Sequence, residues 1–161
     1  MAENIEEQRF APYCPPATLL LILKHYRKKA VPERLGKDTL VQVGIPEGLV
    51  NRTWQTLTFL GLIDADGVTT KDFRALRYAN DDEYPGAFRK IVEKAYANIF
   101  SVLDPTTATE VQLNNAFHPY NPLGQRSRMV TLFLGLCQES GIAVAVQPRA
   151  RSTASESSVR R

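Results

Sequence analysis

One stretch of the sequence, GIPEGLVNRTWQTLTFLGLIDADGVTT at residues 44–70, constrains the fold more than any other. Gly44 follows a short helical segment at 37–43, and a glycine in this position is the usual end of a helix. Pro46 suits the first turn of a second helix over about 47–60, because proline lacks an N–H that would have no partner there. Two helices joined by a tight glycine turn form a helix-turn-helix. The segment LIDADGVTT that follows predicts two short strands around a turn, and hence a β-hairpin wing.

Helical patterns cover most of the remaining chain. A first helix is expected over about 17–29, after a proline-rich segment. Apolar residues three and four apart predict a helix of about five turns over 88–103. A capping box at 107–110 begins a short helix, and a very apolar helix follows over 127–140. The expected fold class is mainly α: a helix-turn-helix with a short β-hairpin wing, followed by a helical C-terminal half.

This pattern divides the chain into four parts. They are an N-terminal extension at 1–14, a winged-helix-like helix-turn-helix domain at 15–80, a helical subdomain at 81–146 and a disordered basic tail at 147–161. The tail has no aliphatic pattern, which is typical of disorder. The apolar stripe of the 88–103 helix has two interpretations. It packs into the chain's own core, the commoner outcome for such a stripe, or it forms a homodimer interface.

The net charge of +3 comes from the end of the chain, where Arg149, Arg151, Arg160 and Arg161 face only Glu156. Residues 1–145 therefore carry no net charge. Duplex DNA is usually bound by strongly basic surfaces. The neutral body is accordingly the main argument against DNA binding.

The helix over 47–60 carries the clearest candidate for a binding face. Asn51, Gln55 and Thr58 lie on one side of it, flanked by Arg52, while apolar residues line the other side. Asn and Gln side chains suit adenine, and Arg suits guanine, in the major groove. The alternative is a solvated helix face that happens to be uncharged. The two interpretations stay open.

A second candidate is the basic cluster at the end of the first helix and beyond it. The cations proposed to contact phosphate are Lys24, Arg27, Lys28, Lys29 and Lys37. The plainer interpretation is that cations gather at a helix C-terminus because the helix dipole favours them there. The predicted wing is evidence against DNA binding, because it carries Asp64 and Asp66 where phosphate contact would require Lys or Arg.

The sequence contains no residue motif typical of a catalytic site or a metal site. His25 and His118 have no Cys or carboxylate at a metal-ligand or nucleophile spacing. Cys137 sits on an apolar helix and is expected to be a buried, inert thiol. No enzyme activity, cofactor or metal is therefore expected. The longest apolar run is far too short to span a membrane, and the N-terminus is acidic rather than signal-like, so we expect a cytoplasmic protein.

Three segments of the sequence, in order and spacing, resemble one prokaryotic family. They are FLGLIDADGVTT at 59–70, YANIF at 96–100 and TLFLGLCQESGI at 131–142, within a match of roughly 12–142. The family is catalogued as domain of unknown function five-three-four-three. The resemblance implies a winged-helix-like helical protein from bacteria, archaea or their mobile elements. It implies no established activity and no catalytic residues.

The sequence leads to two functional hypotheses. The first is a non-enzymatic DNA-binding regulator of winged-helix type, of prokaryotic or mobile-element origin, whose partners are double-stranded DNA and a second copy of itself. The alternative is a protein–protein interaction adaptor that reuses the scaffold, inside a defence-type assembly. An adaptor predicts an exposed apolar patch, for which Phe59 and Tyr120 are the candidates.

Overall fold

A computed structural model describes residues 10–147 of the 161-residue chain. Helices dominate this part, and the mainly α class is confirmed. The α-helices are α2 (Pro16–Lys28), α3 (Lys37–Val43), α4 (Glu47–Phe59), α5 (Lys71–Tyr78), α6 (Tyr84–Ala95), α7 (Ala97–Phe100), α8 (Glu110–Phe117) and α9 (Arg126–Glu139), and a short 3-10 helix η1 (Leu123–Gln125) precedes α9.

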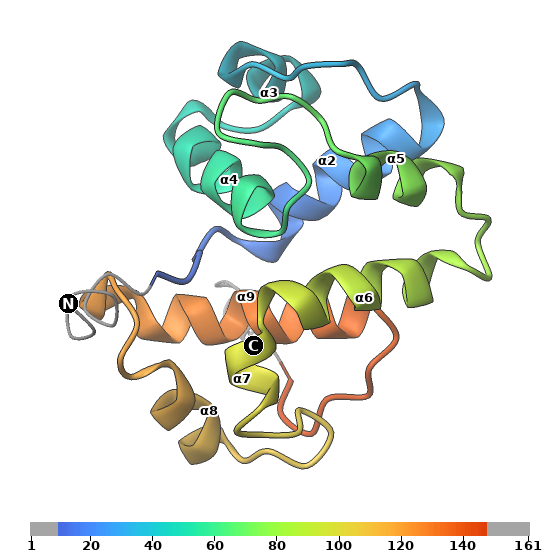
Figure 1. Ribbon diagram of the computed structural model, residues 1–161. Helices are drawn as coiled ribbons and strands as arrows, with labels where there is room; N and C mark the ends of the chain where they lie inside the picture. The colour runs from blue at the N-terminus through green and yellow to red at the C-terminus, as the bar shows by residue number, and fades with distance from the viewer. Residues whose placement is uncertain (1–9, 148–161) are drawn as a thin grey trace, which may run out of the picture.

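The helices form two layers, with α2 to α5 above and α6 to α9 below (Figure 1). In the upper layer, α2 runs between α4 on one side and α5 on the other, and α3 lies at the top. In the lower layer, α6 and α9 lie side by side where the two layers meet, and α7 and α8 lie beneath them. The basic tail predicted at 147–161 lies, beyond Gln147, outside the described residues, as do residues 1–9.

The prediction of a β-hairpin wing is wrong. Residues 10–147 contain no β-strand, and the segment after α4 has only isolated bridges, Ile63 with Thr69 and Arg34 with Val68. The physical reason is that this segment bonds sideways to the chain before α3. Leu35 N donates to Gly67 O at 2.8 Å, and Thr69 N donates to Glu33 O at 2.9 Å.

The turn after α4 also curls onto itself instead of projecting outward. The Asp64 carboxylate accepts the backbone N–H groups of Asp66 and Val68, at 2.8 and 3.0 Å. Gly67 is buried, and a Cβ at its position would lie 2.8 Å from the Trp54 ring. The segment is therefore a packed turn that covers one edge of α4.

The five-turn helix predicted over 88–103 is broken near its middle. Tyr96 has φ −104° and ψ 30°, and it separates α6 from α7. The apolar stripe nevertheless packs inside the chain: Phe88, Ile91, Val92 and Ile99 are all buried. Because α6 lies against α9, this stripe belongs to the core of the molecule and does not form an open face.

The capping box before α8 lies two residues later than predicted. Thr109 accepts a hydrogen bond from Gln112 N at 3.1 Å, and the Gln112 side chain accepts from Thr109 N at 2.9 Å. Thr107 cannot begin the helix, because its backbone N–H donates to Asp104 O in a separate turn. The chain completes this turn before the helix begins.

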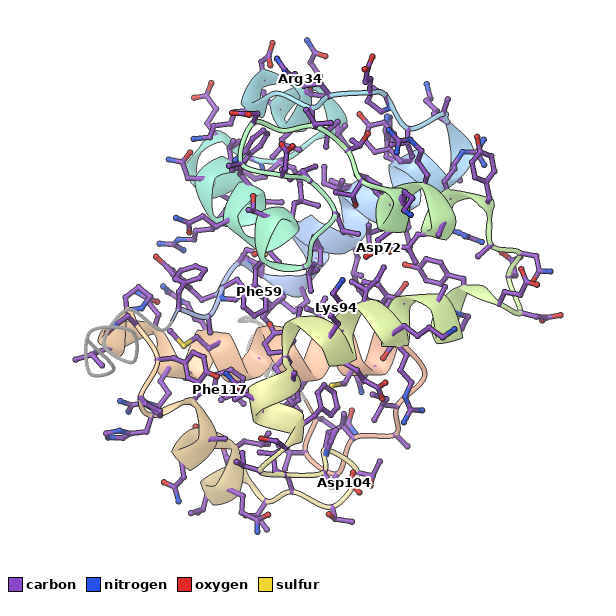
Figure 2. The ribbon with its side chains drawn as sticks, in the orientation of Figure 1. Arg34, Phe59, Asp72, Lys94, Asp104 and Phe117 are labelled. Atoms are coloured by element: carbon purple, nitrogen blue, oxygen red, sulfur yellow. The ribbon has the colours of Figure 1, made fainter. Side chains whose placement is uncertain are left out.

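A cluster of aromatic side chains joins the two layers. The Tyr96 ring lies 4.9 Å from Phe59 of α4, 6.3 Å from Phe117 of α8 and 5.0 Å from Phe133 of α9, as measured between ring centroids. Phe59 lies above α9 and Phe117 below it (Figure 2). Most of these contacts are edge-on, the arrangement that aromatic rings prefer. The cluster makes α2 to α5 and α6 to α9 parts of one core.

Candidate nucleic-acid interface

Helix α4 has one buried side and one open side. Val50, Leu57 and Leu60 are buried as predicted, whereas Trp54 is only partly buried. The buried side also contains Thr53 and Thr56, which the apolar pattern did not reveal. A buried threonine is possible here because its hydroxyl can bond the carbonyl four residues earlier in the same helix.

The two threonines also connect α4 to the rest of the upper layer. The Thr53 hydroxyl donates to Leu49 O at 2.8 Å and lies 2.9 Å from the Thr18 hydroxyl of α2. The Thr56 hydroxyl lies 3.2 Å from the buried Cys14 sulfur. These contacts fix the rotation of α4 about its axis, and thereby decide which side chains face outward.

The outward side of α4 consists of Asn51, Gln55 and Thr58, all exposed. Among the residues that the structure describes, the side-chain amides of Asn51 and Gln55 have no hydrogen-bond partner. The Thr58 hydroxyl donates to Trp54 O at 3.0 Å. We call these three residues the polar strip. Within residues 10–147, nothing from the C-terminal half covers it.

A cation lies on each side of the polar strip. The Arg52 guanidinium stacks over the Tyr13 ring at 5.0 Å from its centroid, and the Lys37 ammonium lies 5.9 Å from the Trp54 centroid. Both pairs are within the range of cation–π attraction. Sequence reasoning missed Tyr13 and Trp54 as partners, because ring contacts between segments far apart in sequence leave no local pattern.

The basic cluster predicted around the end of α2 is split. Lys37 lies near α4, but the end of α2 lies beside α5, on the other side of the upper layer from α4 (Figure 1). Lys24, Lys28 and Lys29 are exposed there. The structure therefore does not bring this cluster and the polar strip onto one face.

Arg27, a predicted phosphate contact, is turned inward. Its guanidinium donates to Leu76 O at 2.7 Å, to Ala79 O at 2.9 Å and to Asp81 at 2.9 Å, and it lies 4.4 Å from the Tyr84 ring centroid. These contacts link α2 to the connection between α5 and α6. Arg27 has a structural role and is not available to a ligand.

A family model matches residues 12–146, which is most of the chain. The chain belongs to the DUF5343 family. The family is described only as one of unknown function. No curated protein and no solved structure is significantly similar to this DUF5343 chain. The family model thus supplies no site residues, and any functional conclusion depends on the geometry of the chain itself.

Both cysteines of this DUF5343 protein are buried. Burial raises the pKa of the Cys137 thiol to about 12, and it raises the pKa of the Cys14 thiol as well. Cys137 is buried as the sequence predicted. The His25 ring lies edge-on to the Tyr26 ring with centroids 4.6 Å apart, and His118 is exposed. Within residues 10–147, no group of three His, Cys, Asp or Glu side chains is placed to hold a metal.

The other surface features offer less chemistry than the polar strip. A pocket between α8, α9 and the end of the described chain is lined by Glu110, Asn114, Val130 and Leu134, among others. Over the described residues, every helix is too short or too polar to cross a lipid bilayer. Phe59 and Tyr120, the candidates for an apolar patch, belong to the aromatic cluster of the core.

Proposed function

We propose that this DUF5343 chain is a non-enzymatic DNA-binding regulatory protein that contacts duplex DNA with the polar strip of α4. The observation that carries the proposal is the strip itself: uncharged hydrogen-bonding side chains, exposed on one helix, with Lys37 and Arg52 on either side. The major groove admits a single α-helix, and amide side chains are suited to base edges there.

The path of the chain supports this use of α4. Only three residues, Gly44 to Pro46, connect α3 to α4, and Gly44 adopts φ 125°, a conformation that favours glycine. A short connection of this kind holds the second helix firmly against the first, while α2 supports both from beneath. The polar strip is consequently rigid as well as exposed.

The distribution of charge also supports the proposal. Residues 10–80, which include α4, contain ten Lys and Arg but six Asp and Glu. Residues 81–147 contain five Lys and Arg but seven Asp and Glu. The neutral body is therefore polarised, with the cation excess in the half that presents the strip. Such an asymmetry attracts a polyanion to one side of a protein whose total charge is small.

The test is the binding of a labelled duplex of mixed sequence, followed by fluorescence anisotropy at low and at raised salt. We expect micromolar or tighter binding at low salt and a loss on the order of tenfold or more at raised salt, because phosphate contacts release counterions. Trp54 is the single tryptophan of the chain and lies beside the strip, so its emission is a second readout.

Two variants locate the surface. Lys37→Ala combined with Arg52→Gln is expected to weaken binding roughly tenfold and to lower the salt dependence. Lys90→Ala, which removes an exposed cation on α6 in the other layer, is the matched control and is expected to bind as the wild type does. If the protein binds no duplex at low salt, the proposal is wrong.

The second candidate function is a protein–protein interaction adaptor, including a homodimer. One observation favours it: Leu21 of α2 and Val41 of α3 are exposed apolar side chains, and Leu21 borders the turn at Gly44. The exposed Asp64 and Asp66 next to α4 also favour a protein partner over DNA. An adaptor is expected to co-purify with a stable protein partner and not to bind duplex DNA. The double variant Leu21→Ser with Val41→Ser should no longer co-purify with that partner.

A further inference from the structure

We infer that the polar strip of α4 reads adenine and not guanine, so that the ligand is duplex DNA with A·T pairs in the major groove that α4 enters. This inference depends on the proposed function and makes it more specific. The evidence is a difference between the side chains of α4. Some are free to form new hydrogen bonds, and others are already engaged within the protein.

The free side chains are the two amides. Asn51 and Gln55 are exposed, and neither has a partner among the described residues. A side-chain amide both donates and accepts, and adenine offers the matching pair in the major groove: the N7 acceptor and the N6 amino donor. Guanine offers two acceptors there, which match the two donors of an arginine or a lysine instead.

The single cation of α4 is held beside the strip and is not placed to read guanine with two hydrogen bonds. Arg52 is the only Lys or Arg between Glu47 and Phe59. It is half-buried, and its guanidinium stacks over Tyr13. Thr58 is also restricted, because its hydroxyl hydrogen is donated to Trp54 O. The strip thus contains two groups that match adenine and none that matches guanine with two hydrogen bonds.

The spacing of the amides suits base pairs about two steps apart. Asn51 and Gln55 are four residues apart, which is about 6 Å along the helix. Base pairs are stacked about 3.4 Å apart, so the two amides span about two base-pair steps. Gly48 is exposed beside them, and a Cβ there would meet no atom within 4 Å. The helix backbone can therefore approach the base edges closely.

The experiment compares two duplexes of about 20 base pairs with identical ends. One has a central block of A·T pairs in mixed order, and the other a central block of G·C pairs. We expect the A·T duplex to bind on the order of tenfold more tightly, which is the size of one good two-hydrogen-bond contact. Asn51→Ala with Gln55→Ala should reduce this preference to less than about threefold while leaving the salt dependence unchanged.

Two controls separate base contacts from other effects. Replacing adenine by 7-deazaadenine removes the N7 acceptor but keeps base pairing and the minor groove, and it should reduce the preference as the double variant does. Asn115→Ala removes an exposed amide from α8, and it should keep the wild-type preference.

Each outcome decides the inference. Equal binding of both duplexes overturns it and leaves the proposed function standing. A preference that survives in the double variant, or with 7-deazaadenine, also overturns it, because DNA shape would then be what is read. If neither duplex binds at low salt, both the inference and the proposed function fail.

Discussion

At the scale of single residues, two arginines hold the ends of two helices together. Arg27 of α2 donates to Leu76 O and Ala79 O at the end of α5, and Arg77 of α5 donates to Lys29 O at the end of α2. The last carbonyls of a helix lack partners inside the helix and carry partial negative charge. Each arginine therefore satisfies the end of the neighbouring helix. This pairing explains part of the basic run at the end of α2 without a ligand.

The first prediction concerns Arg27. We expect Arg27→Ala to lower the free energy of unfolding by about 2 kcal/mol, because several hydrogen bonds to a charged group are lost. Lys28→Ala, which changes an exposed neighbour, is expected to stay within about 0.5 kcal/mol of the wild type. Urea denaturation measures both. Equal stabilities of the two variants would show that Arg27 does not hold α2 and α5 together.

The second prediction compares two glycines in the left-handed region. Gly67 has φ 88°, and a Cβ there would collide with Leu35 O and the Trp54 ring, whereas Gly61 has φ 77° and open space around it. We expect Gly67→Ala to cost about 2–4 kcal/mol and Gly61→Ala only about 1 kcal/mol. The difference in urea midpoints measures the collision alone. Equal losses would mean that the turn does not pack on α4 as described.

At the scale of secondary-structure elements, the two layers approach each other closely where α2 meets α9. A Cβ at Gly135, in the middle of α9, would lie 2.8 Å from two carbons of the Pro16 ring at the start of α2. The absence of a side chain at Gly135 lets the two helices pack directly. In contrast, Gly48 lies on the open side of α4, where a side chain would meet nothing.

The third prediction follows from this contrast. Gly135→Ala is expected to destabilise the protein by about 1–3 kcal/mol through overpacking, although alanine is the better helix former. Gly48→Ala is expected to stabilise it by roughly 0.5 kcal/mol, because only helix propensity changes. Thermal unfolding of the two variants should therefore shift in opposite directions. A stabilising Gly135→Ala would contradict the close contact between α2 and α9.

At the scale of the whole molecule, the aromatic cluster makes the two halves one cooperative unit. Cys14 lies before α2, and Cys137 lies near the end of α9; both are buried. Opening either half exposes aromatic surface of the other, because Phe59 of the upper layer contacts Tyr96, which packs in turn on Phe133 in the lower layer. We therefore expect the halves to unfold together.

The fourth prediction uses the two thiols as reporters of cooperativity. At pH 8, a thiol reagent is expected to label Cys14 and Cys137 on the order of 10³-fold or more slowly than in the unfolded chain. Both labelling rates should rise with the same dependence on urea, as mass spectrometry of labelled peptides would show. Labelling of one cysteine at clearly lower urea would mean that its half opens alone.

The fifth prediction concerns alkaline pH. Burial raises the pKa of Cys137 from 9.0 to about 12 in the folded state, so the unfolded chain releases this proton first as the pH rises. The corresponding stability is fully present below pH 9 and is lost between about pH 9 and pH 12. Between pH 9 and pH 10, Cys137→Ala should lose stability less steeply than the wild type in urea titrations. Parallel slopes would contradict a buried, neutral thiol.

Much of the helical framework was predictable because its signals are local. A proline in the first turn, a glycine after the last turn and an apolar spacing of three and four act within a few residues. They correctly indicated α2, α3, α4 and α9 to within about one residue. The same local rules failed for the segment at 62–70. Its strand-like pattern was real, but its backbone partners lie at 33–35, and no local signal specifies them.

The sequence by itself determined that this protein is helical, and it determined which residues of α4 are polar. The tertiary structure alone decided that Asn51 and Gln55 have no partner among residues 10–147, that Arg52 stacks on Tyr13 and that Arg27 binds the end of α5. The physical reason is the range of the interactions. Helix formation depends on neighbours within one turn, whereas the availability of a side chain depends on contacts between segments far apart in sequence.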